Sequence, residues 1–343
     1  MEKERIVLSR RYLAILVLAV AGVAILLVGK CGKPKLVYHS HKGVVWTTEY
    51  NITYKAAVDL GDSIDRVLQS VDTTASVYNA VSVVSRVNNG TSMQVNPMFV
   101  KLFEASKAIN KLSEGAFDPT VMPLVNAWGF GYKSGNLPTT AQIDSILTFV
   151  GMDKVNLSGL NVVKNDERVQ LDFSSIAKGM ACDEIGAMLM RNGAESFLVE
   201  IGGEVAAYGV NEQGQPWNVS VDLPVDQTDK VEHMQAMTLV MDKGGVATSG
   251  NYRKFKIVDG KKVSHIVNPK TGQPEQSSLL SATIVAANCM TADAWATACM
   301  AMGTDRAKSL MQNCDTLGVM LISVDDSGNY VVWSNKRFTK SLK

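Results

Sequence analysis

The chain has 343 residues, of which 46% are hydrophobic and 20% are charged, and its formal net charge at pH 7 is +1. A chain of this length and composition can bury a substantial hydrophobic core, which is typical of a globular protein. The near-neutral charge excludes the broad basic surface that binding to a phosphate backbone requires. We therefore expect no nucleic-acid partner.

The N-terminus differs from the rest of the chain, because an apolar run without a charged side chain follows several Lys and Arg residues. The run is long enough to cross a bilayer and predicts an export signal or a transmembrane anchor. Since no small-x-small cleavage pattern follows it, we favour an anchor in a bacterial inner (cytoplasmic) membrane, with the folded domain on the periplasmic, exported side. The predicted organisation is a basic flank, a membrane segment, a polar connector and a catalytic domain, over residues 1–11, 12–29, 30–43 and 44–343.

The chain has five cysteines and no C-x-x-C pair. One of them, Cys31, lies just after the apolar run and follows Lys30 rather than a small residue, which leaves its lipidation open. No disulfide framework is expected from this spacing, and the other cysteines are predicted to be buried free thiols.

The apolar pattern predicts a strand and a helix at the start of the domain, over residues 44–54 and 60–78. Two more helices are expected over 97–112 and 141–150, then a strand, a helix and a strand over 169–173, 176–191 and 197–201. Further strands are expected at 217–221, 236–241, 254–258, 263–267 and 281–286, before a helix over 291–302. Because strands do not alternate one for one with helices, we predict an α+β fold in which mixed or antiparallel sheets pack against helices.

Asp293 and Thr297 are the first candidates for chemistry. They lie four residues apart on an otherwise apolar predicted helix, so their side chains point the same way. A carboxylate and a hydroxyl are hard oxygen ligands of the kind that Mg²⁺ prefers. The alternative is structural: Asp293 caps the helix locally and Thr297 bonds back to the backbone.

A second group of polar residues lies at the predicted strand-to-helix junction over residues 172–179. Asp172 and Ser175 offer oxygens to a cation or ligand, Lys178 offers a positive charge, and N–H groups at a helix start attract phosphate. Ordinary helix capping by Asp172 or Ser174 is the competing interpretation.

His265 begins a third segment, residues 265–272, in which an Asn-Pro turn closes at Gly272. A histidine at the end of a strand is able to bind a diphosphate or act as a base near pH 7. A structural histidine is the alternative. The chain has neither the G-x-G-x-x-G pattern of dinucleotide folds nor a P-loop, so any nucleotide is held in another way.

In this order, the segments resemble the ApbE family of FAD:protein FMN transferases over nearly all of the chain beyond residue 44. The resemblance is carried by eight motifs, among them Gly-Ala-Phe-Asp-Pro-Thr, Asn-Ala-Trp-Gly-Phe-Gly and Ala-Asp-Ala-Trp-Ala-Thr. Their positions are 76–78 with 85–88, 115–121, 124–131, 172–179, 202–203, 248–252, 265–272 and 292–297.

The resemblance implies an ApbE-like, T-fold-like catalytic domain that transfers FMN from FAD to a Thr or Ser hydroxyl of an acceptor protein and releases AMP. It implies an FAD site formed by Tyr78, Ala116, Phe117, Asp118, Asp172 and Lys178. It also implies a Mg²⁺ site, which Mn²⁺ could also occupy, formed by Ser175, Asp293 and Thr297. His265 would border the diphosphate and aid proton transfer, and with Asp293 it is the predicted catalytic pair.

Two positions depart from the family pattern. The family commonly begins its first strand with Met-Gly-Thr, where this chain has Trp46-Thr47-Thr48, and Asn268 stands where an Asp is usual. The first departure weakens the expectation of a flavin contact at Trp46. The second removes a negative charge beside the expected metal and diphosphate.

Partners and alternatives follow from the same resemblance. Expected acceptors are flavin-bearing subunits of Na⁺-translocating NADH:quinone reductase or Rnf-type complexes, or other exported flavoproteins. An alternative is Mg²⁺-dependent hydrolysis of FAD to FMN and AMP, and another is a non-catalytic FAD-binding lipoprotein. The sequence alone does not separate these three.

Overall fold

The computed structural model describes residues 34–340, except for residues 133–136, 225–234, 252–254 and 259–260. The predicted membrane segment and Cys31 lie outside the described residues. None of the helices in the described part of the chain is both long and apolar enough to cross a membrane.

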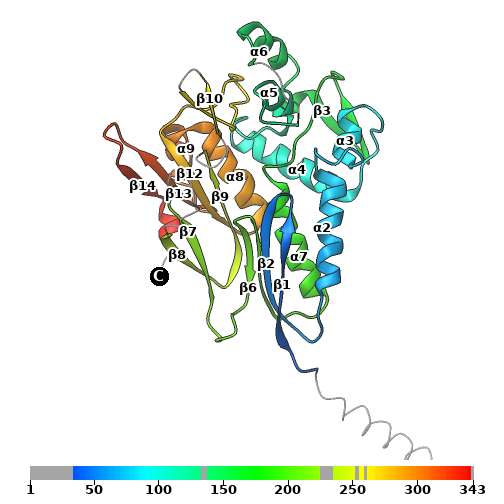
Figure 1. The fold of residues 1–343 in the computed structure, drawn as a ribbon, viewed down its shortest axis with the longest axis vertical. Helices are drawn as coiled ribbons and strands as arrows, with labels where there is room; N and C mark the ends of the chain where they lie inside the picture. Colours follow the sequence, from blue (N-terminus) through cyan, green and yellow to red (C-terminus); the bar gives the residue numbers. More distant parts are fainter. Residues whose placement is uncertain (1–33, 133–136, 225–234, 252–254, 259–260, 341–343) are drawn as a thin grey trace, which may run out of the picture.

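An eight-stranded sheet forms the centre of the molecule (Figure 1). Every neighbouring pair in it is antiparallel, which agrees with the predicted α+β class. Its strands, in spatial order, are β1 (Val37–Val45), β2 (Thr48–Ala56), β5 (Ser196–Ile201), β6 (Glu204–Tyr208), β9 (Lys243–Gly250), β12 (Leu279–Ala286), β13 (Gly318–Val324) and β14 (Tyr330–Ser334).

Within the described residues, three two-stranded ribbons accompany the sheet: β3 (Val155–Ser158) with β4 (Asn161–Lys164), β7 (Trp217–Asp222) with β8 (Gln235–Met241), and β10 (Phe255–Val258) with β11 (Lys261–Ser264). The helices are α2 (Gly61–Ala75), α3 (Val83–Asn88), α4 (Pro97–Leu112), η1 (Pro119–Val121), α5 (Met122–Ala127), α6 (Thr140–Leu147), η2 (Met152–Lys154), α7 (Ala177–Arg191), α8 (Cys289–Met302), α9 (Thr304–Met311) and α10 (Lys336–Thr339).

The two faces of the sheet are covered differently. Helices α7 and α8 pack on one face and share the largest hydrophobic core with α2 and α4. The β7–β8 ribbon and Phe338 of α10 cover the other face. Along β6, successive residues alternate between these two cores: Val205 and Ala207 face the ribbon, whereas Ala206 faces the helices.

Three predicted strands require correction. The strand expected over residues 263–267 lies earlier in the chain, as β11, and ends at Ser264 before His265. Residues 44–54 were expected to form one strand, but β1 and β2 form a hairpin that turns at Trp46 and Thr47, and β1 begins at Val37, inside the predicted connector. Residues 169–173 are not a strand. The amide side chain of Asn88 takes the place of a neighbouring strand by binding both the N–H and the carbonyl of Leu171, at 2.7 and 2.8 Å.

The tip of the β1–β2 hairpin is strained. Trp46 and Thr47 have φ values of 50° and 63°, the left-handed conformation that a two-residue hairpin turn requires and that a β-branched residue rarely adopts. The Trp46 indole N–H donates to Asp72 at 3.1 Å, which fixes the tip against α2. A glycine at position 47, which the resemblance to the ApbE pattern implies, would adopt this conformation without strain.

We therefore expect Thr47→Gly to raise the free energy of unfolding by about 1 kcal/mol, because glycine relieves the left-handed strain. Urea unfolding curves measure the effect. Thr53→Gly, in the regular part of β2, is the control and should lower stability, since glycine weakens a strand interior. Lower stability in Thr47→Gly would contradict the strain argument.

The four described cysteines are free thiols, as the sequence predicts. Cys182, Cys289 and Cys299 are buried, whereas Cys314 is only partly buried.

Candidate active site

Helices α7 and α8 make an unusually close contact at Gly179. A Cβ atom there would lie 2.5 Å from the carbonyl oxygen of Cys289 and 2.8 Å from the Cβ of Asp293. The Gly179 N–H donates to Asp293 Oδ2 at 2.9 Å. The start of α7 therefore holds the Asp293 carboxylate directly, as a consequence of having no side chain at position 179.

Asp293 is buried, with 2% of its surface exposed, in a helix whose other inward residues are apolar. Lys178, in the first turn of α7, forms an ion pair with Glu204 at the start of β6. Lys178 also interacts electrostatically with Asp293. We call Lys178, Glu204 and Asp293 the charged cluster. The sequence predicted Lys178 in the FAD site and Asp293 in the metal site, and it did not single out Glu204.

The electrostatics of the charged cluster show an excess of negative charge. Burial raises the pKa of both Asp293 and Glu204, against the lowering effect of Lys178. Burial alone would lower the pKa of Lys178, but the two carboxylates outweigh it and raise that pKa. One ammonium faces two buried carboxylates, so full ionisation leaves one uncompensated negative charge, which is costly unless a cation binds.

Hydroxyl groups extend the charged cluster along α8. Thr297 lies one turn beyond Asp293, and its Oγ1 is 3.2 Å from Ser249 Oγ on β9, so the side chain bonds to a neighbouring strand rather than back to its own helix. Ser175 precedes α7 by two residues and is partly buried. Ser175, Asp293 and Thr297 thus offer one carboxylate and two hydroxyl oxygens.

This donor set fits a hard divalent cation in its chemistry. Within residues that the structure describes, no group of three or more His, Cys, Asp or Glu side chains could hold a metal ion. A cation here would therefore depend on hydroxyl, backbone or phosphate oxygens besides Asp293, which is the way Mg²⁺ is commonly bound. The uncompensated carboxylate charge and the unpartnered Oε2 of Glu204 agree with such a cation.

The helix start itself is less available to phosphate than the sequence suggested. The N–H groups of Ile176 and Ala177 donate to the carbonyl of Phe173, at 3.0 and 2.8 Å, and Gly179 donates to Asp293. No side chain caps α7. Instead, Asp172 accepts from the N–H and hydroxyl of Ser174, at 2.8 and 2.5 Å, in a turn that precedes the helix.

Asp172 connects the charged cluster to a second group of predicted residues. Its N–H donates to the carbonyl of Pro119 at 2.7 Å, which brings the segment before α7 beside Asp118. Partial burial and the neighbouring Asp172 carboxylate raise the pKa of Tyr78, which is 70% exposed. Burial raises the pKa of Asp172 itself. Tyr78, Asp118 and Asp172 therefore lie in one region.

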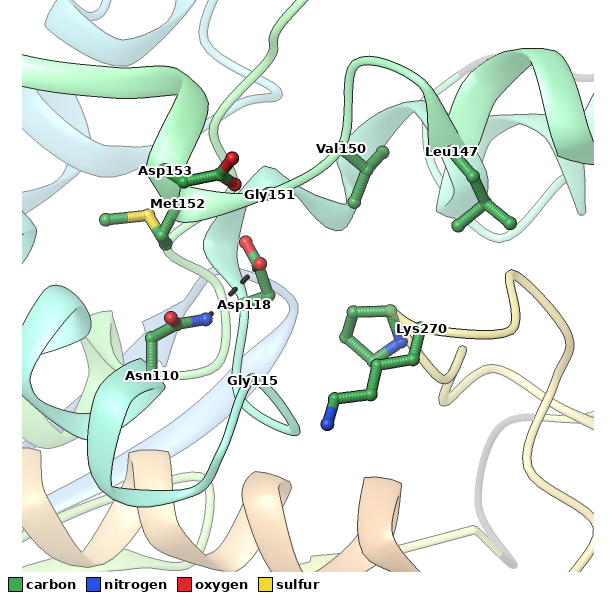
Figure 2. Close-up of a pocket in the computed structure, with 10 residues that line it drawn as sticks. Asn110, Gly115, Asp118, Leu147, Val150, Gly151, Met152, Asp153 and Lys270 are labelled. Atoms are coloured by element: carbon green, nitrogen blue, oxygen red, sulfur yellow. Dashed lines mark hydrogen bonds between the residues drawn. The ribbon is translucent and has the colours of Figure 1, made fainter.

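A cavity of about 410 Å³ adjoins Asp118 (Figure 2). Figure 2 shows Asp118 and Lys270 on opposite sides of it, with Val150 and Leu147 on a third. The walls come from the end of α4, the segment before η1, the segment after α6, and the loop that follows β11. Segments far apart in the sequence thus form one concave site, as ligand binding requires.

Asp118 is held firmly beside this cavity. It caps η1 by accepting from the N–H and hydroxyl of Thr120, at 2.8 and 2.6 Å, and it accepts from Asn110 at 3.3 Å. Burial raises its pKa, and these hydrogen bonds oppose the effect. Ala116 and Phe117, which the sequence placed in the FAD site, are only 4% and 2% exposed as whole residues and do not line the cavity.

His265 follows the last residue of β11, and its ring packs edge-on against Phe130 with centroids 6.4 Å apart. The loop after it carries Lys270 to the cavity wall. Asn268 holds this loop: its Oδ1 accepts from the N–H of Lys270 at 3.0 Å, and its amide N–H lies 3.4 Å from the carbonyl of Ala301. An Asp at this position would lack that amide donor, which gives the departure from the family pattern a structural reason.

Two residues of the site, Glu204 and Asn110, were not predicted from the sequence, whereas Ser249 lies in the predicted 248–252 motif. Glu204 carried a signal, because it directly follows the Gly202-Gly203 turn, and a charged residue on an otherwise apolar strand needs a partner. Asn110 carried none, although its contacts with Phe117 and Asp118 lie only seven and eight residues further along the chain.

The sequence profile of the ApbE family matches residues 46–321. The FAD:protein FMN transferase of Vibrio cholerae is 34% identical over 321 residues, covering 90% of this chain and 94% of that protein. That of Haemophilus influenzae is 34% identical over 289 residues, covering 81% and 82%.

Solved structures give the same result. The flavin transferase ApbE from Vibrio cholerae superposes with a TM-score of 0.80 at 31% identity, covering 90% of this chain and all of that one. The apo form of the flavinyl transferase ApbE from Pseudomonas stutzeri gives a TM-score of 0.80 at 28% identity and covers 90% and 97%. With its fold, its motifs and its full-length relatives in agreement, this chain belongs to the ApbE family.

Proposed function

We propose that this protein is a Mg²⁺-dependent FAD:protein FMN transferase that attaches FMN through a phosphoester to a Thr or Ser hydroxyl of an acceptor protein. The observation that carries the proposal is the charged cluster at the α7–α8 contact, together with the segment before α7, where the Asp172 N–H binds Pro119 next to the Asp118 cavity. The site thereby combines a cation-binding carboxylate, a lysine for phosphate and a concave space for a large ligand. The names of the relatives support the same activity.

In the proposed reaction, the acceptor hydroxyl oxygen attacks the FMN-side phosphorus of FAD. A new phosphorus–oxygen bond forms, the bond to the AMP phosphate breaks, and AMP leaves with its electron pair. Lys178 neutralises charge on the diphosphate, and His265 accepts the hydroxyl proton. Such chemistry is carried mainly by positioning and charge neutralisation, which explains why the charged cluster lies on rigid helices and strands.

Ser175, Asp293 and Thr297 are the residues that would hold the metal. Bound there, Mg²⁺ would offset the negative charge of the diphosphate and of the leaving AMP. Mn²⁺ accepts similar oxygen ligands and is the expected substitute.

The metal site can be tested through stability alone. A cation that binds only the folded state at 100 times its Kd stabilises it by about 2.7 kcal/mol, or roughly 4 °C in Tm for a chain of this size. We expect Mg²⁺ to produce such a rise in the wild type and none in Asp293→Asn, as measured by differential scanning calorimetry in EDTA and in excess Mg²⁺. A wild-type Tm that is the same in both would contradict the site.

Hydrolysis of FAD to FMN and AMP is the competing enzymatic function, because the same site with water in place of the acceptor hydroxyl would perform it. AMP release measured by chromatography, with and without an acceptor domain, separates the two. A transferase releases AMP in step with labelled acceptor, whereas a hydrolase releases it without acceptor. A non-catalytic FAD-binding protein releases none.

We further propose that the enzyme is anchored in the bacterial inner membrane by its N-terminal apolar run, with the catalytic domain on the periplasmic side. The proposed acceptors are exported flavoproteins, including flavin-bearing subunits of Na⁺-translocating NADH:quinone reductase or Rnf-type complexes. Membrane fractionation and protease protection of whole cells test the location.

A further inference from the structure

Glu204 is a deeply buried acid whose position is fixed by its backbone. It is the first residue of β6, where it pairs with Ile201, and its carbonyl accepts from the Cys182 thiol of α7 at 3.3 Å. The Gly202-Gly203 turn before it is tied down by Glu200, which accepts from the Gly203 N–H at 2.8 Å. The side chain of Glu204 is 5% exposed, so it extends from this fixed point beneath the start of α7.

The Glu204 carboxylate has one strong partner. One oxygen forms the ion pair with Lys178, and the other, Oε2, has no hydrogen-bond partner although it is buried. A buried carboxylate that leaves an oxygen unsatisfied costs stability. Apolar residues in place of the Lys178–Glu204 pair would avoid that cost to stability. The presence of the charged pair therefore indicates a role in the functional site rather than in the hydrophobic core.

Lys178 needs such a partner because of where it lies. The start of a helix carries partial positive charge, and α7 has no acidic residue in its first turn. A lysine there is unfavourable unless carboxylates from other elements offset it. Glu204 supplies one from β6 and Asp293 another from α8, so the ammonium is held between two fixed acids.

We propose that Glu204 is a positioning residue for FMN transfer, which fixes the Lys178 ammonium at the place where the diphosphate of FAD binds. This inference rests on the proposed function. In this role Glu204 orients the Lys178 side chain and does not itself contact FAD. Lys178 contributes binding energy wherever its ammonium reaches the diphosphate, but it supports the reaction only when held at one point.

The variants are Glu204→Gln, Lys178→Met and their combination in the full-length protein, with Glu200→Gln as the matched control. Glu200 supports the same Gly-Gly turn but binds Gly203 and Asn51 rather than Lys178. The measurements are the Kd for FAD from quenching of flavin fluorescence in EDTA, and kcat for acceptor labelling with Mg²⁺.

We expect Glu204→Gln to lower kcat at least 10-fold while the Kd for FAD stays the same or falls, because a negative charge near the diphosphate is lost. Lys178→Met should raise the Kd at least 10-fold. The double variant should lose no more kcat than Lys178→Met alone, since Glu204 acts through the lysine. Glu200→Gln should match the wild type within about twofold.

The inference is overturned if Glu204→Gln keeps kcat within twofold of the wild type. It is also overturned if Glu204→Gln lowers kcat, FAD binding and Tm together. A third contradicting result is a double variant whose loss of kcat equals the product of the losses in Glu204→Gln and Lys178→Met. Should Glu204→Gln fail to fold, Glu204→Asp takes its place: it keeps the charge but is shorter, and kcat should fall with FAD binding retained. A wild type that neither binds FAD nor labels the acceptor would instead contradict the proposed function.

Discussion

Asp293→Asn should lower the rate of FMN transfer at least about 100-fold while leaving the protein folded. The asparagine oxygen can still accept from the Gly179 N–H, so the contact between α7 and α8 is kept. What is lost is the negative charge that would hold a cation and that faces Lys178. Charge stabilisation of this kind is worth several kcal/mol in transition-state free energy.

Stability should move in the opposite direction from activity. Burial raises the pKa of Asp293, which means that the carboxylate is costly in the metal-free protein. Removing it leaves Lys178 and Glu204 as a neutral pair. We therefore expect the Tm of Asp293→Asn in EDTA to equal or exceed that of the wild type.

Asp183→Asn is the matched control for this experiment. Asp183 is a partly buried aspartate at the same helix contact, and it accepts from the first N–H groups of α8, those of Cys289 and Met290, at 2.9 and 2.8 Å. Its replacement should lower stability by about 1–2 kcal/mol and leave the rate per folded molecule nearly unchanged. Equal activity losses in the two variants would show that Asp293 acts only through the fold.

Gly179→Ala should damage both stability and activity. The new methyl group would lie 2.5 and 2.7 Å from the carbonyl oxygen and carbon of Cys289, which are backbone atoms that cannot rotate away. The two helices must separate, and the Gly179 N–H must move away from Asp293. Overpacking of this kind costs roughly 1–3 kcal/mol. We expect a Tm lower by several degrees and a loss of most turnover.

Gly61→Ala is the control, because it makes the same change at the first residue of α2. Its nearest neighbours are the ring atoms of His41, at 3.0 and 3.2 Å, which belong to a side chain able to move. It should change stability by less than about 1 kcal/mol. If Gly179→Ala were as well tolerated as Gly61→Ala, the close contact that positions Asp293 would not exist.

The fold could be predicted where local sequence decides it. The predicted helix over 97–112 coincides with α4, because Asn96 caps it, Pro97 opens it and its apolar residues repeat at helical spacing. The β1–β2 turn was missed because Trp46-Thr47 carries none of the Asn or Gly residues that mark such turns. Residues 169–173 have the composition of a strand, and only the distant Asn88 decides otherwise.

The candidate site was predictable in its parts but not in its connections. Lys178 and Asp293 were named from their motifs, and the structure joins them in one charged cluster. Their third partner, Glu204, lies on another strand, and spacing along the chain does not indicate that it reaches Lys178. The roles of His265 as a base and of Ser175 as a ligand stay predictions.

The most direct test of the proposed activity is the intact mass of an acceptor domain after incubation with the full-length protein, FAD and Mg²⁺. The proposal predicts a gain equal to one FMN moiety, located on a Thr or Ser by fragmentation, which is absent with EDTA or with Asp293→Asn. The proposal would be contradicted if FAD were broken down to FMN and AMP while none of the exported flavoproteins of the same cell, tested as acceptors, gained mass.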